Sequence, residues 1–155
     1  MEYKAQYEAY LAQASKALDA ACGQFLPETS EVCRAARYSL LGGGKRIRAV
    51  LVLSVCDLLG GDKAAAGQFA AAVEMLHCYS LIHDDLPCMD NDDLRRGRPS
   101  CHKAFDEATA MLAGDVLLTE AFEVVANAPA SAQACVRAAR ALGAGAGSRG
   151  MVYGQ

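Results

Sequence analysis

The chain is organised around the stretch LIHDDLPCMDNDDLRRGRPS, which runs from Leu81 to Ser100. Five of the ten residues from Asp84 to Asp93 are aspartate. Three arginines follow this acidic cluster, namely Arg95, Arg96 and Arg98. Crowded carboxylates repel one another unless cations lie among them, and Mg²⁺ prefers such hard oxygen ligands. Because arginine forks match phosphate oxygens, the stretch predicts a site for a metal ion and a diphosphate.

The acidic cluster follows a predicted helix from about Lys63 to Asp85, which Pro87 stops. Within this helix His77 and Asp84 are seven residues apart, so both face the same side. Asp84 and Asp90 would lie on different sides of a regular helix, since six residues turn it by roughly 600°. We expect the interruption at Pro87 to bring Asp90 back beside Asp84. The alternative interpretation is a solvated acidic helix end.

The remaining sequence predicts helices throughout, because apolar residues recur at helical spacing and β-branched runs are scarce. The expected helices cover residues 2–22, 45–59, 106–127 and 131–142, with another that Thr29 or Ser30 caps and that ends near Leu41. Residues 143–155 are either loop or further helix. No convincing strand is found. We therefore predict an all-α fold, a buried helical bundle of one domain or a piece of one.

A second cluster, GGGKRIR, occupies residues 42–48. Its glycines permit a tight turn, and the helix that follows offers free N–H groups to an anion. Lys45 and Arg48 are three residues apart, so they are expected to project from one helix face onto one anion. The alternative is a glycine helix stop followed by a solvated basic turn.

Composition excludes several classes of protein. A net charge of −3 without a basic stripe argues against nucleic acid as a partner. No apolar run is long enough to span a bilayer. The seven cysteines are scattered and form no CxxC pair, so they indicate reduced, mostly buried thiols in a cytoplasmic protein. His83 and His102 are expected to be structural, and neither a zinc site nor an EF-hand fits the spacing.

The segment DDLPCMD at 84–90, continuing into LRRG at 94–97, resembles the first aspartate-rich motif of the trans-isoprenyl diphosphate synthases. The two extra residues between its aspartates make it most similar to bacterial farnesyl diphosphate synthases. GGKRIR at 43–48 resembles that family's upstream GGKRxR element, although Ala49 stands where proline is usual. Further similar segments are EMLH at 74–77 and GDVLL at 114–118, so the resemblance covers essentially the whole chain.

The resemblance implies an isoprenoid-synthase helical bundle around a deep cavity, usually in a homodimer. It implies condensation of isopentenyl diphosphate with an allylic diphosphate, dimethylallyl or geranyl, to give farnesyl diphosphate. In this interpretation Asp84 and Asp90 bind Mg²⁺ on the allylic diphosphate, and Asp85 assists. Arg95 is implied to contact the same diphosphate. The residues implied to hold isopentenyl diphosphate are Lys45, Arg48, His77 and Arg96.

Tyr79 lies five residues before Asp84, which places it about 7.5 Å deeper along the helix at ~1.5 Å per residue. An aromatic ring at that depth is a candidate floor for the growing prenyl chain. In the similar synthases an aromatic at this place goes with short products. The alternative is an ordinary core tyrosine.

The resemblance is to the N-terminal half of the family, which carries a second aspartate-rich motif further along. After Asp115 the only acidic residues here are Glu120 and Glu123. We therefore expect residues 1–155 to be the N-terminal part of a single polyprenyl synthase domain, inactive alone. The alternative is a short non-catalytic paralogue that dimerises with or regulates a full synthase. A terpene cyclase is disfavoured, because its site has no second diphosphate for the basic residues to hold.

Overall fold

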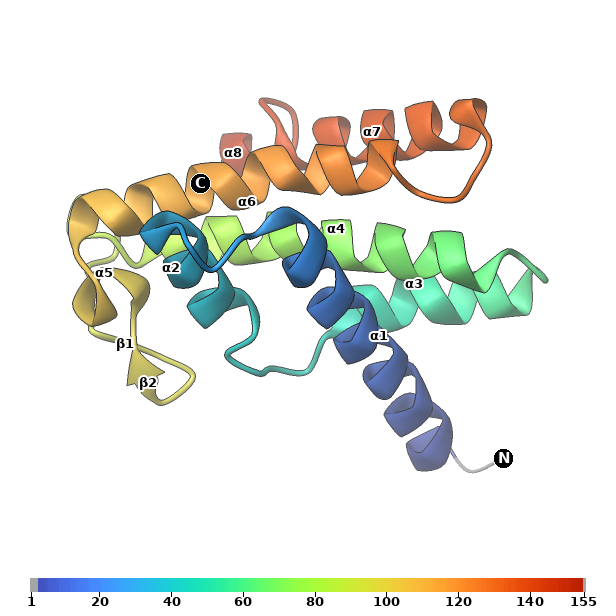
Figure 1. The fold of residues 1–155 in the computed structure, drawn as a ribbon, viewed down its shortest axis with the longest axis horizontal. Helices are drawn as coiled ribbons and strands as arrows, with labels where there is room; N and C mark the ends of the chain where they lie inside the picture. Colours follow the sequence, from blue (N-terminus) through green and yellow to red (C-terminus); the bar gives the residue numbers. More distant parts are fainter. Residues whose placement is uncertain (1–2, 155) are drawn as a thin grey trace.

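The helix that leads into the acidic cluster, α4 (Lys63–Asp84), lies at the centre of the fold (Figure 1). The computed structural model describes residues 3–154. Asp62 caps the start of α4, because its carboxylate accepts a hydrogen bond from the Ala65 N–H at 2.8 Å. The predicted bounds of this helix are thus confirmed to within one residue.

The other helices follow the apolar periodicity of the sequence. They are α1 (Tyr3–Phe25), α2 (Glu31–Leu40), α3 (Ile47–Leu58), α6 (Glu107–Ala126) and α7 (Ala132–Ala146), with the short α5 (Cys101–Ala104) and α8 (Met151–Gly154). Ser30, Asp106 and Ser131 cap α2, α6 and α7 with side-chain oxygens. The predicted all-α fold is confirmed.

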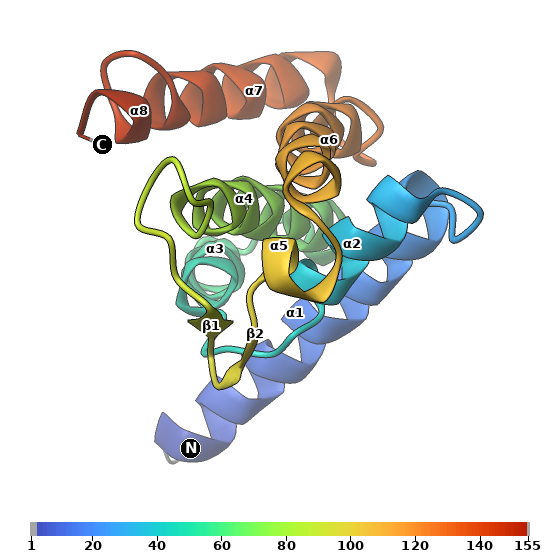
Figure 2. The same cartoon turned by 90° about the vertical axis from the view of Figure 1, so that its left-hand side faces the viewer.

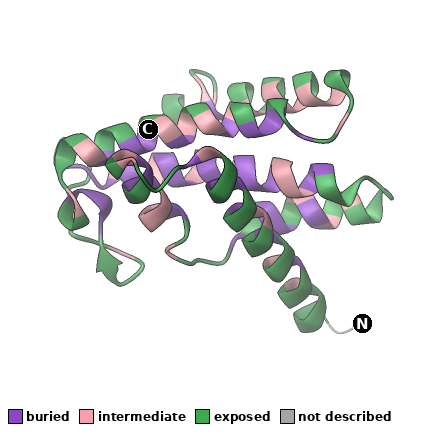
Figure 3. Cartoon of the chain, in the orientation of Figure 1, coloured by how far each residue is buried: buried purple, intermediate pink, exposed green. Residues whose placement is uncertain are grey.

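Figure 1 shows α7, α6, α4 and α3 as successive layers, with α1 crossing them at an angle; Figure 2 shows the same order of layers from the end of the molecule. The facing sides of α4 and α6 are buried, whereas the N-terminal half of α1 is largely exposed (Figure 3). Small residues let α4 and α6 approach closely. A Cβ at Gly114 of α6 would overlap the His83 ring of α4, so glycine is required there.

Two expectations from the sequence are wrong in detail. A small antiparallel hairpin forms from β1 (Leu94–Arg95) and β2 (Arg98–Pro99), although no strand was expected. It is too short to show an alternating pattern. The third helix begins at Ile47 instead of Lys45, because Arg46 adopts a left-handed conformation with φ 48°. Residues 143–154 combine both alternatives, since α7 continues to Ala146 and α8 follows a short loop.

Across residues 3–154, no helix is both long and apolar enough to cross a membrane. The cysteines are free thiols, and four of them are buried, as expected. Burial raises the pKa of the Cys22 thiol to about 11 and that of the Cys78 thiol to about 12, so both stay protonated and pack as small apolar groups.

Candidate functional site

The aspartate-rich loop folds as its sequence predicts. Helix α4 ends at Asp84, and the chain turns back so that the Asp90 N–H donates a hydrogen bond to the Asp84 carbonyl at 2.8 Å. The Leu86 carbonyl accepts further bonds from the N–H groups of Met89 and Asn91. The interruption after α4 therefore brings Asp90 beside Asp84, six residues away in sequence.

The two carboxylates repel each other. Partial burial and the neighbouring charge of Asp90 raise the pKa of Asp84, and the Arg95 guanidinium only partly opposes them. A cation placed between these oxygens would relieve that repulsion. Across residues 3–154 no group of three or more acidic, histidine or cysteine side chains could cage a metal ion. A pair of carboxylates nevertheless fits Mg²⁺, which takes one or two carboxylates and completes its shell with water and phosphate oxygens.

Asp85 and Arg95 form an ion pair with each other. The Asp85 side chain is only 3% exposed, and its carboxylate accepts two bonds from the Arg95 Nε, at 3.0 and 3.2 Å, and a third from Nη2. Asp92 lies 3.6 Å from the same guanidinium. This pairing raises the pKa of Arg95 and fixes the first strand of the hairpin to the end of α4.

The glycine-rich loop is anchored by a buried ion pair. Arg46 lies with its Nη1 3.4 Å from the Glu74 Oε2, and both side chains are less than a tenth exposed. Arg46 also donates to the Leu40 carbonyl at 2.5 Å. The other carboxylate oxygen of Glu74 accepts from the Ala49 N–H at 3.2 Å, which satisfies a free donor in the first turn of α3. Glu74 thus joins the loop, α3 and α4.

Lys45 and Arg48 do not share a helix face, contrary to the argument from their spacing. The left-handed turn at Arg46 leaves Lys45 outside α3 and Arg48 inside its first turn. The Lys45 carbonyl accepts a hydrogen bond from the Tyr7 hydroxyl at 2.5 Å, and Lys45 is one of the residues that border a groove between α1 and α3.

A cationic cluster forms around His77. Burial, together with the positive charges of Arg48, Arg96 and Arg46, holds the pKa of His77 below its usual value. His77 is therefore neutral near pH 7 and can donate one N–H to an anion. Glu74 opposes the shift from one turn away on the same helix face.

Arg96 connects the two sequence motifs. Its guanidinium donates to the Gly43 carbonyl across 53 residues. A Cβ at Gly44 would come within 2.8 Å of the Arg96 Cζ and would displace this guanidinium, and the φ of 118° at residue 44 also favours glycine. The basic end of the aspartate-rich stretch therefore lies directly on the glycine-rich loop.

Tyr79 lines a cavity of about 240 Å³ together with Asp84. Met111 of α6 and Met151 of α8 form other parts of its wall. Tyr79 is 7% exposed, and its ring packs edge-on against His83 at 5.7 Å between ring centres. Burial and the Asp84 charge raise the pKa of Tyr79, so its hydroxyl stays neutral. The ring and the aspartate thus border one space.

The remaining histidines make structural contacts. The Nε2 atom of His83 lies 2.9 Å from the Met111 carbonyl, which ties α4 to α6. The buried His102 has its Nδ1 atom 3.1 Å from the Ser100 hydroxyl.

Sequence reasoning missed the anchoring role of Glu74 and Arg46, because nothing local shows that an acid and a base 28 residues apart will pair. It also missed Tyr38, which contacts the hairpin from α2. The charge pattern indicates that Arg95 and Asp85 lie near each other, but their direct pairing depends on the hairpin.

The chain is similar to known proteins over most of its length. The polyprenyl synthetase family model matches residues 29–146. The chain is 52% identical over 132 residues to the farnesyl diphosphate synthase of Micrococcus luteus, covering 85% of this chain and 45% of that protein. It is 54% identical over 145 residues to the chloroplastic heterodimeric geranylgeranyl pyrophosphate synthase large subunit 1 of Arabidopsis thaliana, covering 91% and 38%.

Among solved structures, the geranyltransferase of Legionella pneumophila matches with a TM-score of 0.93 at 44% identity. That match covers 98% of this chain and 54% of the other. The chain spans less than half the length of both curated relatives.

Proposed function

Because the chain belongs to the polyprenyl synthetase family, we propose that residues 1–155 form the N-terminal part of a polyprenyl synthase domain. This domain condenses isopentenyl diphosphate with an allylic diphosphate, dimethylallyl or geranyl. The observation that carries the proposal is the contact of Arg96 with Gly43, which brings two motifs that are distant in sequence together and supports a shared role in binding an anion.

The acidic side of the site would hold the allylic diphosphate. Asp84 and Asp90 are the residues that would bind Mg²⁺, which when bound neutralises charge on the departing diphosphate. Arg95 lies beside them and adds a positive charge, while Asp85 fixes its orientation. This arrangement favours breaking the C–O bond of the allylic diphosphate, because the leaving oxygen takes the electron pair in a cationic environment.

The basic side would hold isopentenyl diphosphate. Arg48 and Arg96 supply charge, neutral His77 donates a hydrogen bond, and Lys45 completes the set from the loop. The alkene of isopentenyl diphosphate then attacks the allylic cation, and the released diphosphate accepts the proton that is lost. The positions of the two anions along one face of α4 would place the reacting carbons close together.

We propose farnesyl diphosphate as the main product, because the Tyr79 ring borders the cavity that starts at Asp84. Relatives named for farnesyl and for geranylgeranyl products are similarly close in sequence, so sequence similarity does not distinguish the two products. The choice of farnesyl diphosphate therefore rests on the cavity wall. Removing the ring enlarges the space available to the prenyl chain.

We further propose a cytoplasmic protein that pairs with a second copy of itself. The scattered, mostly buried thiols support a reducing environment. The Arabidopsis relative is named as chloroplastic and heterodimeric, so a different subunit is the competing partner. The mass of the purified protein, measured by sedimentation with and without a candidate partner, distinguishes these assemblies.

The test is product formation from isopentenyl and geranyl diphosphates with Mg²⁺, followed by chromatography. The complete synthase domain carrying these residues should make farnesyl diphosphate. The 155-residue chain alone should bind diphosphate but release no product. Absence of condensation by the complete domain would refute the proposed function, whereas turnover by the short chain would refute its assignment as a part.

A further inference from the structure

The hairpin that carries Arg95 and Arg96 is too small to hold its own shape. Each strand has two residues, and the register pairs Leu94 with Pro99 and Arg95 with Arg98. Isolated two-stranded hairpins are marginal in water even when they are longer. Other contacts must therefore fix the direction in which the hairpin points.

Arg96 is especially sensitive to that direction, because it lies at the tip. Arg96 and Gly97 form the two-residue loop, with φ values of 55° and 75°. Two positive φ values in a row are the pattern of a type I′ turn, whose twist matches the strands. A small rotation of the hairpin would lift the Arg96 guanidinium away from Gly43 and Gly44.

Tyr38, near the end of α2, contacts both residues of the second strand. Its hydroxyl donates a hydrogen bond to the Pro99 carbonyl at 2.9 Å. The Arg98 guanidinium carbon lies 4.3 Å from the centre of its ring, a cation–π contact. Phe105 packs edge-on against the same ring at 5.7 Å, which keeps the ring from turning.

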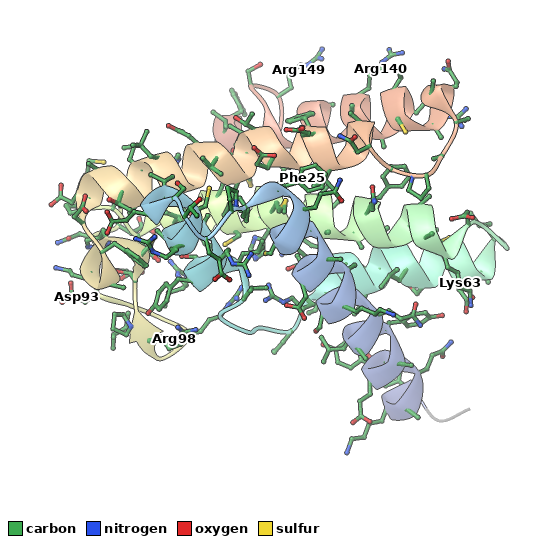
Figure 4. All side chains as sticks on the ribbon, in the orientation of Figure 1. Phe25, Lys63, Asp93, Arg98, Arg140 and Arg149 are labelled. Carbon is green, nitrogen blue, oxygen red and sulfur yellow. The ribbon has the colours of Figure 1, made fainter. Side chains whose placement is uncertain are left out.

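Arg98 also reaches the loop that follows α2. Its Nη1 atom would be 3.1 Å from a Cβ at Gly42, one residue before the carbonyl that Arg96 contacts. Figure 4 shows Arg98 at the same end of the molecule as Asp93, far from Lys63. Two of the hairpin's three arginines thus lie against adjacent glycines, Arg98 near Gly42 and Arg96 on Gly43.

We propose that Tyr38 and Arg98 are positioning residues, which hold the hairpin so that Arg96 stays on the glycine-rich loop in the geometry that binds a diphosphate. This inference rests on the proposed function, since it takes Arg96 as a diphosphate ligand. Tyr38 and Arg98 act through Arg96 and do not themselves touch the substrate.

The test is a double-mutant cycle on the affinity for inorganic diphosphate, measured by calorimetry without divalent metal. Tyr38→Leu should weaken binding about three- to tenfold, the scale of one lost hydrogen bond or cation–π contact. In an Arg96→Gln background the same change should have no further effect. A purely structural role would weaken binding equally in both backgrounds and would overturn the inference.

Two milder variants keep the test usable if Tyr38→Leu does not fold. Arg98→Lys keeps the charge but loses the planar face, so it should reproduce most of the loss, whereas Tyr38→Phe keeps the ring and should show a smaller one. Arg140→Gln removes a charge from the exposed face of α7 and is the control (Figure 4). Equal affinity of Arg98→Lys and the original protein would overturn the inference.

The outcomes also separate this inference from the function on which it rests. If Arg96→Gln binds diphosphate as tightly as the original protein, both the ligand role of Arg96 and the positioning role fail. If Arg96→Gln weakens binding while the Tyr38 and Arg98 variants do not, only the positioning role fails.

Discussion

Removing the Glu74 carboxylate should destabilise the protein more than any surface change of the same kind. In Glu74→Ala the Arg46 guanidinium stays buried without its partner, and the Ala49 N–H in the first turn of α3 loses its acceptor. Breaking a buried ion pair in this way costs about 3–5 kcal/mol. For a domain of this size, each kcal/mol lowers Tm by roughly 2–4 °C, so Tm should fall by about 6–20 °C.

The assay is equilibrium denaturation followed by circular dichroism, with Glu8→Ala on the exposed face of α1 as the control. Glu74→Gln should lie between the original protein and Glu74→Ala, because its amide oxygen can still accept from Ala49. The double change Arg46→Met with Glu74→Leu should recover most of the loss, since an apolar pair removes the uncompensated charge. A loss below about 1 kcal/mol in Glu74→Ala would refute the anchoring argument.

Four further predictions concern the residues of the site. Asp84→Ala or Asp90→Ala in the complete domain should reduce turnover by at least 10²–10³-fold, the scale of one lost electrostatic contact to a leaving group, and product formation within a few-fold of normal would exclude the metal assignment. Tyr79→Ala should extend the product by at least one isoprene unit, and chromatography showing an unchanged product with full activity would place the floor elsewhere. Because Arg48 and Arg96 help to hold the pKa of His77 down, a bound diphosphate that offsets their charge should raise this pKa and draw in a proton as the pH falls through the imidazole range, an uptake measured by calorimetry in buffers of different ionisation enthalpy and reduced in His77→Gln. The lowered pKa of His77 also means that the unfolded chain binds more protons than the folded protein below about pH 6.5, so His77 should make the protein less stable as the pH falls. An unchanged pH dependence of the free energy of unfolding in His77→Gln would contradict this.

The sequence predicts the helices well because capping residues and apolar spacing are local signals. Asp62, Asp106 and Ser131 each stand where a helix begins, and each side chain makes the expected bond. The return of Asp90 to Asp84 was also predictable, since a proline inside a helical pattern must interrupt it. These features depend on residues within about six positions of one another.

The parts that could not be predicted depend on distant contacts. The start of α3 is displaced by the left-handed turn at Arg46, which is stabilised by Glu74 from another helix. The hairpin forms because Asp85 and Tyr38 hold its strands from two other elements. None of these contacts leaves a pattern in the neighbouring sequence. Residue spacing alone therefore wrongly placed Lys45 on the same helix face as Arg48.

We propose that the acidic and basic clusters bind diphosphate side by side along one face of α4. The most direct measurement is the affinity of the purified protein for inorganic diphosphate with and without Mg²⁺. We expect Mg²⁺ to tighten binding at least tenfold, and we expect Asp84→Ala to abolish that gain while leaving metal-free binding within about twofold. We expect Arg96→Gln to weaken the metal-free binding, which the basic side supplies. An Mg²⁺ effect that survives in Asp84→Ala, or metal-free binding that is insensitive to Arg96→Gln, would contradict the account.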